Sequence, residues 1–365
     1  MFFLYFGQNF TIMKKFFKIL LWIILTVAIL FVGFLAYISI TDYRPAKVIN
    51  LMSGSNATIE PLDKDTFNLM TWNIGYAGLG AGMDFFYDGG TKVRPSKKMV
   101  EKYLKGIEHF VSSRDSIDFW FIQEVDRHSH RSYDFNEVKA ISEAKKGSHA
   151  IFAFNYKCPF VPVPWYDPLG AVKGGLMTLT DYPYDEATRY AYPLIASWPK
   201  KLFLLDRAFI LMRFPLANGK DLVIMNTHNS AYVYDSLLRV KELNVLKKKM
   251  LEEYAKGNYV IAGGDWNANP PNFRPAGKFD GNRFVRTKVQ MSDNTFPSSW
   301  RWAYDPTAPS NRQNYKSFVR GENGTTTIDY FIISPNVTLL RVKTIDLNFA
   351  DSDHNPVYMK VMLKQ

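Results

Sequence analysis

Cysteine is almost missing from this sequence. The only one is Cys158 among 365 residues, so no intramolecular disulfide can form and cysteine pairing gives no information about the compartment. The same scarcity excludes clustered Cys/His zinc sites. It also excludes a lipoprotein anchor, which would need a cysteine beside the N-terminal apolar run. The sequence has no internal repeat of fixed period and no low-complexity tract, and the glycines at 75–82 lack the Gly-Lys-Ser/Thr ending of a phosphate-binding P-loop.

The composition is sufficient for a large hydrophobic core. Hydrophobic residues make up 47% of the chain and aromatic residues 16%. A chain of this length fits one domain of roughly 250–300 residues or two smaller ones. The net charge of +11 favours phosphate-bearing or anionic-membrane partners.

A long uncharged run lies near the N-terminus, at residues 19–41. Its length of about 23 residues is sufficient for a membrane-spanning helix. Three lysines at 14–18 precede it, so the positive-inside rule predicts a cytoplasmic N-terminus (1–18), a single transmembrane helix (19–41), and the rest of the chain in the periplasm or outside the cell. The alternative is a cleaved signal peptide with a cleavage site at Ala36–Ser39, but the run is longer than a signal core. Met13 would be a more natural start than Met1.

The chain after this run is predicted to have a polar, turn-rich linker (42–65) and one domain (66–365). Apolar strand-like segments in that domain repeatedly end in polar residues. These ends are Asn73, Glu124, His228, Asp265 with Asn267, Asp329, and Asp353 with His354. A helix capped by Ser96 is expected between the first two strands, and the order strand, helix, strand predicts an α/β layered domain. The proline- and aromatic-rich stretch 155–169 predicts a packed irregular loop, or an exposed apolar loop that touches lipid or substrate, because prolines exclude a central strand.

The polar strand ends supply the groups that phosphoester cleavage needs. Mg²⁺ takes oxygen ligands and keeps several waters, so one or two carboxylates such as Glu124 and Asp353 are sufficient. Hydrolysis also needs an activated water, donors to the non-bridging oxygens, and stabilisation of the leaving oxygen. Each residue alone has an ordinary structural interpretation: Asn73 as a turn cap, His228 as a hydrogen-bonded core residue, Asp265 as a turn former. Their joint occurrence at strand ends favours one shared site.

Seven short motifs occur along residues 66–365. They are Thr71-Trp72-Asn73, Ile122-Gln123-Glu124, Gly174-Gly175-Leu176, Asn226-Thr227-His228, Gly264-Asp265-Trp266-Asn267, Ile328-Asp329-Tyr330 and Ser352-Asp353-His354. In this order they resemble the endonuclease/exonuclease/phosphatase superfamily, in particular its deoxyribonuclease-like and sphingomyelinase-like members. The resemblance implies a four-layer α/β sandwich, with two packed mixed β-sheets flanked by helices, and phosphodiester hydrolysis with Mg²⁺ or Mn²⁺.

The resemblance also implies a metal side of the site. Glu124 would be the main metal ligand, Asn73 would lie close to both metal and phosphate, and Asp353 would be a further carboxylate beside the metal. Gly75 departs from the DNA-repair members, many of which carry an acidic residue there, and this argues against a DNA-repair function. Arg207 matches a commonly basic position and is a candidate phosphate contact, although a surface role fits it nearly as well.

The remaining motif residues would act on the proton and the phosphate. By resemblance, Asp265 would orient or deprotonate the attacking water and Asn267 would hold the phosphate. His354, paired with Asp329, would be a base or a transition-state stabiliser. His228 occupies the position of the leaving-group acid in the deoxyribonuclease-like branch.

The leading hypothesis is a membrane-anchored, metal-dependent phosphodiesterase that acts outside the cytoplasm. Its substrate would be either a phospholipid or sphingolipid headgroup, suggested by the aromatic segment near Trp165, or extracellular nucleic acid, suggested by the basic charge and His228. A non-catalytic anion-binding module on the same fold is the rival from another class. Nothing in the sequence requires an obligate protein partner.

Overall fold

The chain folds into a long N-terminal helix followed by a domain of strands and helices. The structure, a computed structural model, describes residues 2–52, 59–231, 236–277, 279–287 and 290–364. The helices are α1 (Phe2–Ile40), α2 (Lys97–Ser112), α3 (Glu137–Ala144) and α4 (Ser236–Ala255), and short 3₁₀ turns include η1 (Gly75–Ala77), η3 (His130–Ser132) and η4 (Lys200–Phe203). The strands are β1 (Val48–Asn50), β2 (Thr66–Asn73), β3 (Phe119–Asp126), β4 (His149–Val161), β5 (Gly170–Thr180), β6 (Glu186–Ala191), β7 (Ala208–Pro215), β8 (Asp221–His228), β9 (Tyr259–Asp265), β10 (Arg283–Phe284), β11 (Arg301–Ala303), β12 (Asn311–Arg312), β13 (Gly324–Thr326), β14 (Asp329–Ile333), β15 (Val337–Thr344) and β16 (Val357–Leu363).

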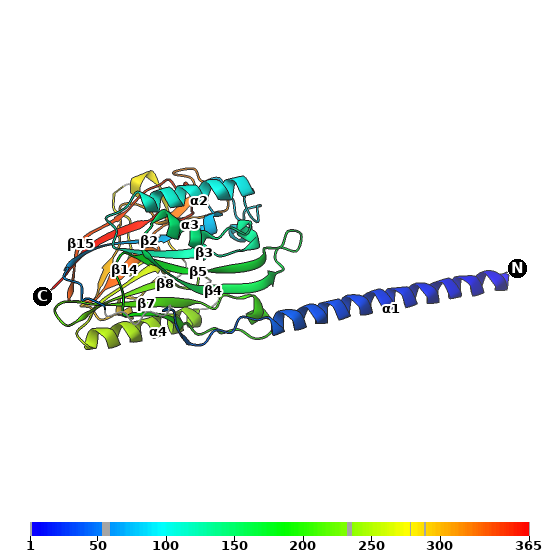
Figure 1. Ribbon diagram of the computed structural model, residues 1–365. Coiled ribbons are helices and arrows are strands. Elements are labelled where there is room, and N and C mark those ends of the chain that lie inside the picture. Colours follow the sequence, from blue (N-terminus) through cyan, green and yellow to red (C-terminus); the bar gives the residue numbers. More distant parts are fainter. Residues whose placement is uncertain (1, 53–58, 232–235, 278, 288–289, 365) are drawn as a thin grey trace.

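Two large sheets lie face to face between helices. One has seven strands in the order β1-β6-β7-β8-β9-β14-β11, and the other has six in the order β15-β16-β2-β3-β5-β4. Helices α2 and α3 cover the outer face of the six-stranded sheet, and α4 covers the outer face of the seven-stranded sheet (Figure 1). The predicted four-layer α/β sandwich is therefore confirmed.

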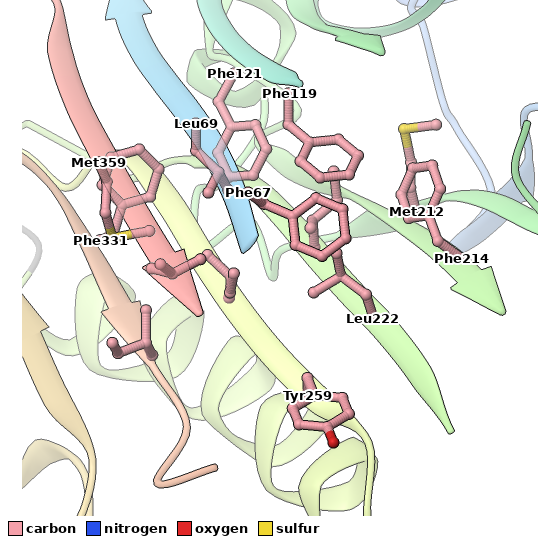
Figure 2. Close-up of a cluster of buried hydrophobic side chains, with 14 of the residues drawn as sticks. Phe67, Leu69, Phe119, Phe121, Met212, Phe214, Leu222, Tyr259, Phe331 and Met359 are labelled. Carbon is pink, nitrogen blue, oxygen red and sulfur yellow. The ribbon is translucent and has the colours of Figure 1, made fainter. Parts of the chain in front are cut away.

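The central strands are apolar on both faces, as buried strands of a layered fold must be. In β2, Phe67 and Leu69 point into the core between the sheets, whereas Met70 and Trp72 pack beneath the helices. Figure 2 shows Phe67 and Leu69 among the aromatic side chains that fill the inter-sheet core. The predicted helix also begins as expected, because the Ser96 side chain accepts a hydrogen bond from the Met99 amide.

Strand direction brings the polar ends to one edge of the sandwich. Strands β2 and β3 are parallel neighbours in one sheet, and β8 and β9 are parallel neighbours in the other. Strand β14 runs antiparallel to β9 and starts where β9 ends, with Asp329 opposite Asp265. Strand β16 likewise runs antiparallel to β2 and starts just after His354. The last residues of four strands and the first residues of two therefore meet.

Two predictions about the less regular segments were wrong in part. The predicted linker contains β1, which pairs with β6 at the edge of the seven-stranded sheet, and Leu62 packs against the core. The stretch 155–169 is irregular only after Val161, because β4 includes Pro159. Proline is tolerated there since β4 is an edge strand, and its pairing with β5 is interrupted between Cys158 and Val161.

Helix α1 extends away from the domain (Figure 1). Its apolar part, Met13–Ile40, has 28 residues and is long enough to cross a membrane, a property that a signal sequence would share. The helix continues without a break from residue 2 to Ile40. It therefore includes positions 14–18 and the predicted span 19–41 except for its last residue, Thr41.

Candidate functional site

Asn73 links the two sheets at the shared edge. Its side-chain amide donates hydrogen bonds to Glu124 Oε1 (3.1 Å) and to Asp265 Oδ2 (3.0 Å), and its Oδ1 accepts one from the Gly75 amide (3.0 Å). Glu124 belongs to the six-stranded sheet and Asp265 to the seven-stranded sheet. One buried side chain at the end of β2 thus fixes the spacing of the two carboxylates.

Glu124 occupies a bulge in β3. Its φ is +53°, in the left-handed region that few non-glycine residues adopt, and the pairing of β3 with β5 shifts between Ile122 and Val125. The bulge turns the carboxylate toward the site, where 26% of the side chain stays exposed. Burial raises the pKa of Glu124, Arg131 opposes this rise, and Asp353 adds to it.

Asp353 lies beside Gly75. Its Oδ2 accepts a hydrogen bond from Asn314 (2.6 Å). A Cβ at position 75 would lie 3.0 Å from Asp353 Oδ1, and Gly75 has a φ of +53°. A larger residue at 75 would therefore crowd the Asp353 carboxylate and strain the backbone. Gly75, the residue that departs from the DNA-repair pattern, thus leaves the space that the Asp353 carboxylate occupies.

Asp265 ends β9 and is almost fully buried. Its Oδ1 accepts a hydrogen bond from the Asn267 backbone amide (2.9 Å), and its Oδ2 lies 3.3 Å from the Asn267 side-chain nitrogen, which also donates to Asn229 O (2.9 Å). Burial and the nearby Asp329 raise the pKa of Asp265 to about 6. Gly264 is required here because a Cβ would lie 1.9 Å from Thr227 O on the neighbouring strand.

His354 and Asp329 form a buried pair. His354 Nδ1 lies 2.8 Å from Asp329 Oδ2, which also accepts a hydrogen bond from Ser310 Oγ (2.7 Å). Burial lowers the pKa of His354, but Asp329, Asp353 and Asp265 outweigh it and raise the pKa to about 10. Burial also raises the pKa of Asp329, against the opposing charge of His354. His354 is therefore an imidazolium near neutral pH.

His228 has the opposite protonation. Its Nε2 lies 3.4 Å from Asp265 Oδ2 and 3.8 Å from Glu124 Oε1, while its buried Nδ1 has no hydrogen-bond partner in the described part of the chain. Burial lowers the pKa of His228 well below 6.5, and the charges of Arg207 and His354 lower it further. Arg207 donates to the His228 carbonyl oxygen (3.2 Å). One site thus contains a neutral and a cationic histidine.

A cavity of about 440 Å³ opens over these groups. Its lining includes most of the residues predicted from sequence, namely Glu124, Arg207, His228, Asp265, Asn267, Asp353 and His354. Asn73 and Asp329 stand directly behind it, bonded to Asp265 and His354. All predicted site residues are therefore brought together.

Several polar residues that line this cavity were not identified from the sequence, among them Arg131, Asn311 and Asn314. Arg131 pairs with Asp126 through two hydrogen bonds of 2.9 Å and lies over the Tyr76 ring. Asn311 places its side-chain nitrogen 3.0 Å from His354 Nε2, and Asn314 bonds Asp353. Arg131 lies in η3, Asn311 begins the two-residue strand β12 and Asn314 follows that strand, so no periodic pattern marks these residues as functional.

The cavity wall suits a hard divalent cation. Glu124 and Asp353 both line it, and Asp353 contributes to the raised pKa of Glu124, a repulsion that a cation between them would relieve. Asp265, Asp329 and His354 offer ligand atoms within 4.8 Å of one another. However, His354 donates toward Asp329 and holds protons on both nitrogens at neutral pH, so it is a poor ligand. Glu124 and Asp353, with the Asn73 oxygen nearby, are the better fit.

Comparisons with known proteins agree with this geometry. The model of the family described as "Endonuclease/Exonuclease/phosphatase family" matches residues 70–354, a range that contains every predicted site residue. A solved endonuclease/exonuclease/phosphatase from Beutenbergia cavernae is similar with a TM-score of 0.55 and 17% identity, over 82% of this chain and 72% of that one. A family protein from Bacteroides thetaiotaomicron has a TM-score of 0.52 and 15% identity, over 82% and 98%.

A third similar structure is that of D. rerio TDP2 in complex with a single-strand DNA product. Its TM-score is 0.51 and its identity 13%, over 82% of this chain and 99% of that chain. At these identities the three likenesses show a shared fold. No curated protein matches the chain.

Proposed function

Because the chain belongs to the endonuclease/exonuclease/phosphatase family, we propose that it is a membrane-anchored, divalent-cation-dependent phosphodiester hydrolase whose domain acts outside the cytoplasm. One observation carries the proposal: Glu124, Asp265 and His354, from three separate segments, line a single cavity. The span in α1 and the lysines before it support the anchored orientation.

The cation has a defined place in this proposal. Glu124 and Asp353 would hold Mg²⁺ or Mn²⁺, with Asn73 close by. When bound, the ion would neutralise charge on the phosphoryl oxygens and on the leaving oxygen.

Asp265 is the proposed proton acceptor. With a pKa raised to about 6, it is mostly ionised at neutral pH and yet basic enough to take a proton from water. Asn73 and Asn267 hold its two oxygens in place, so the carboxylate is oriented before substrate arrives. The water oxygen then bonds to phosphorus as the bond to the leaving oxygen breaks, and the water proton passes to Asp265.

The two histidines take different roles. His354, already protonated, cannot be the base; it would stabilise the charge that develops on the phosphoryl oxygens, with Asp329 keeping it cationic. His228 is neutral in the free protein, so it would first donate a hydrogen bond. The charges of a bound phosphoester and of the neighbouring Asp265 would raise its pKa, so that His228 takes up a proton from solvent, delivers it to the leaving oxygen and returns to its neutral form. Arg207 and Asn267 line the cavity as candidate phosphate contacts.

The proposal is tested with the purified full chain in detergent. We expect Mg²⁺-dependent, chelator-sensitive hydrolysis of bis-p-nitrophenyl phosphate. Asp265→Ala and His354→Ala should each lower turnover by about 10²–10⁴-fold, as expected for removal of an acid–base group. Unchanged turnover in both variants would refute the catalytic roles of Asp265 and His354. No chelator-sensitive hydrolysis by the wild type would leave only the rival proposal, an anion-binding module without catalysis.

Nucleic acid is the alternative substrate class for the same reaction. The net charge of +11 and Arg207 at the cavity favour it, and the similar D. rerio structure holds a DNA product. Plasmid DNA and lipid vesicles offered side by side with Mg²⁺ separate the two: nicking without headgroup release would establish the nuclease.

A further inference from the structure

An exposed apolar surface is made up by two segments, the end of β4 with the loop after it and the segment before η4. We call it the aromatic rim, and it consists of Phe160, Val163, Trp165, Tyr166, Ile195 and Trp198. Trp165 is 86% exposed and Trp198 is 56% exposed. Exposed tryptophans gathered with other apolar side chains mark a surface that is covered by another apolar phase.

The aromatic rim is attached to the end of the membrane helix. Phe34 of α1 contacts Phe160 edge to face (ring centroids 6.0 Å apart) and stacks with Phe203 of η4 (6.3 Å). The Trp198 ring nitrogen donates to Ser39 Oγ (3.1 Å), again on α1. Figure 1 shows that α1 leaves the domain on the side where β4 ends. Phe160 and Trp198 thus bring both segments of the rim to the end of α1.

The length of α1 gives the depth of this contact. About 20 residues at 1.5 Å each cross the hydrocarbon core, so a span that starts at Ile19 ends near Ile38. Ser39 then lies at the boundary between hydrocarbon and headgroups and Phe34 about 6 Å inside it. Trp198, which touches Ser39, and Phe160, which touches Phe34, therefore lie at the boundary or just inside it. Tryptophan and tyrosine concentrate at that boundary because they have an apolar body and a polar tip.

Exposed lysines accompany the rim. Lys200 and Lys201 follow Trp198 and Pro199, and the Lys157 ammonium lies over the ring of Tyr43 (5.2 Å), just beyond α1. Cations next to apolar side chains match the phosphates and acyl chains of a lipid leaflet. The combination of cations with apolar side chains favours a bilayer with charged headgroups over an uncharged apolar partner.

The lining of the cavity over the site includes a residue that packs on α1. Phe203, which stacks on Phe34 of α1, also lines the cavity, together with Leu169, Leu204 and Leu205. The same lining holds the carboxylates and histidines of the site. The cavity thus combines polar groups for a phosphoester with apolar residues, one of which, Phe203, packs on α1.

We infer that the aromatic rim rests on the leaflet in which α1 ends, and that the substrate is a phosphoester of a lipid in that leaflet. The substrate half of this inference rests on the proposed hydrolase function, whereas the contact with the bilayer does not. The lipid headgroup lies against the polar groups of the cavity, and its apolar part lies along Leu204 and Leu205.

The contact is tested with the full chain in phosphatidylcholine–phosphatidylglycerol vesicles. Trp165→Cys is labelled with an environment-sensitive fluorophore, and Leu340→Cys is the matched control, an exposed apolar position in β15 far from α1. The wild type serves as the labelling blank because Cys158 is buried. We expect phosphatidylcholine carrying a nitroxide near its headgroup to quench the probe at 165 and not at 340. Equal quenching at both positions, or a signal at 165 that depends on protein density instead of lipid, would refute the contact; the latter would indicate a second copy on the rim.

The substrate is tested in the same vesicles by turnover. The double variant Trp165→Ala/Trp198→Ala should hydrolyse a headgroup-labelled phospholipid about tenfold more slowly, because it loses two rings that would be buried in the leaflet. Its hydrolysis of soluble bis-p-nitrophenyl phosphate should match that of Leu340→Ala and the wild type. Equal lipid hydrolysis by variant and wild type, or cleavage of DNA alone, would overturn the lipid substrate. Quenching at 165 without hydrolysis of any phosphoester would instead refute the proposed function and leave the contact standing.

Discussion

Replacing Asp329 with asparagine should show whether His354 acts through the positive charge of its ring or only through its position. The substitution keeps the side-chain size but removes the charge 2.8 Å from His354 Nδ1. Ser310 can still donate to the remaining side-chain oxygen, so the local packing is retained. The variant therefore tests whether the charge on the imidazolium matters for turnover.

The size of the effect follows from the pKa of His354. Its rise from 6.5 to about 10 corresponds to a preference for the imidazolium on the order of 5 kcal/mol, at 1.36 kcal/mol per pH unit. Burial opposes the rise, and Asp329 is the leading carboxylate that overcomes it. Without Asp329 the pKa should fall to near neutrality or below. Most molecules then lack the positive charge at neutral pH, and turnover should fall by about 10²–10³-fold, as when one transition-state donor is removed.

The measurement is kcat/KM for bis-p-nitrophenyl phosphate from neutral to alkaline pH. The wild type should keep its activity until the pH approaches the His354 pKa of about 10, whereas Asp329→Asn should lose activity from near neutrality upward. Asp118→Asn is the control. Asp118 is also buried and ion-paired (with Lys64, 2.6 Å), but it lies just before β3, at the end of that strand away from Glu124 and the site. An alkaline limb that is the same in Asp329→Asn and the wild type would refute the assignment of His354 as a cationic stabiliser.

Four further predictions follow. Asp265→Asn should lower kcat by about 10²–10⁴-fold with little change in melting temperature, and the wild-type rate should rise as pH increases through about 6, the pKa of this base. Glu124→Gln should abolish the rise in melting temperature that Mg²⁺ gives the wild type, as seen by thermal unfolding with and without the ion. The folded-state pKa of His354 lies above its unfolded value, so its stabilisation is complete below pH 6.5 and is lost as pH rises through about 10; urea unfolding should show this loss in the wild type and not in His354→Gln. Gly75→Ala should destabilise the fold by about 1 kcal/mol or more in the same assay and weaken the Mg²⁺ effect, because its Cβ would crowd Asp353 at a positive φ.

The polar strand ends could be predicted because they depend on local patterns. A run of apolar residues followed by a polar one marks the end of a buried strand, and the order of such runs with one helix between them fixes which ends are neighbours. Asn73, His228 and Asp265 were all found in this way, each at the last position of its strand. The family resemblance added the roles but was not needed to locate these residues.

Other features could not be predicted because they depend on tertiary contacts. The bulge at Glu124 arises where β3 meets β5, and the sequence of β3 alone does not reveal it. Arg131 reaches the cavity from a short 3₁₀ turn, guided by its hydrogen bonds to Asp126. The prolines of 155–169 excluded a central strand but not an edge strand, and the position of β4 at the sheet edge, where Pro159 is acceptable, is set by the whole topology.

The protonation states were the least accessible to sequence. His228 and His354 look alike as strand-end histidines, but one is neutral and the other cationic because of what surrounds them. His228 lies near Arg207, whereas His354 is bonded to Asp329. A difference of this kind separates a hydrogen-bond donor from a charged stabiliser, and it appears only when the two sheets are assembled.

Three of the contacts that define the site cross between the two sheets. Asn73 and Gln123 of the six-stranded sheet bond Asp265 and Asn226 of the other sheet, at 3.0 and 2.8 Å, and His354 beside β16 bonds Asp329 of β14. The distance between acceptor, stabiliser and cation ligands is therefore set by how the apolar faces of the sheets pack, and interiors packed to crystal-like density resist such displacements. Because a misplacement of about 1 Å can cost on the order of 10²-fold in rate, the inter-sheet core is as much a determinant of turnover as of stability.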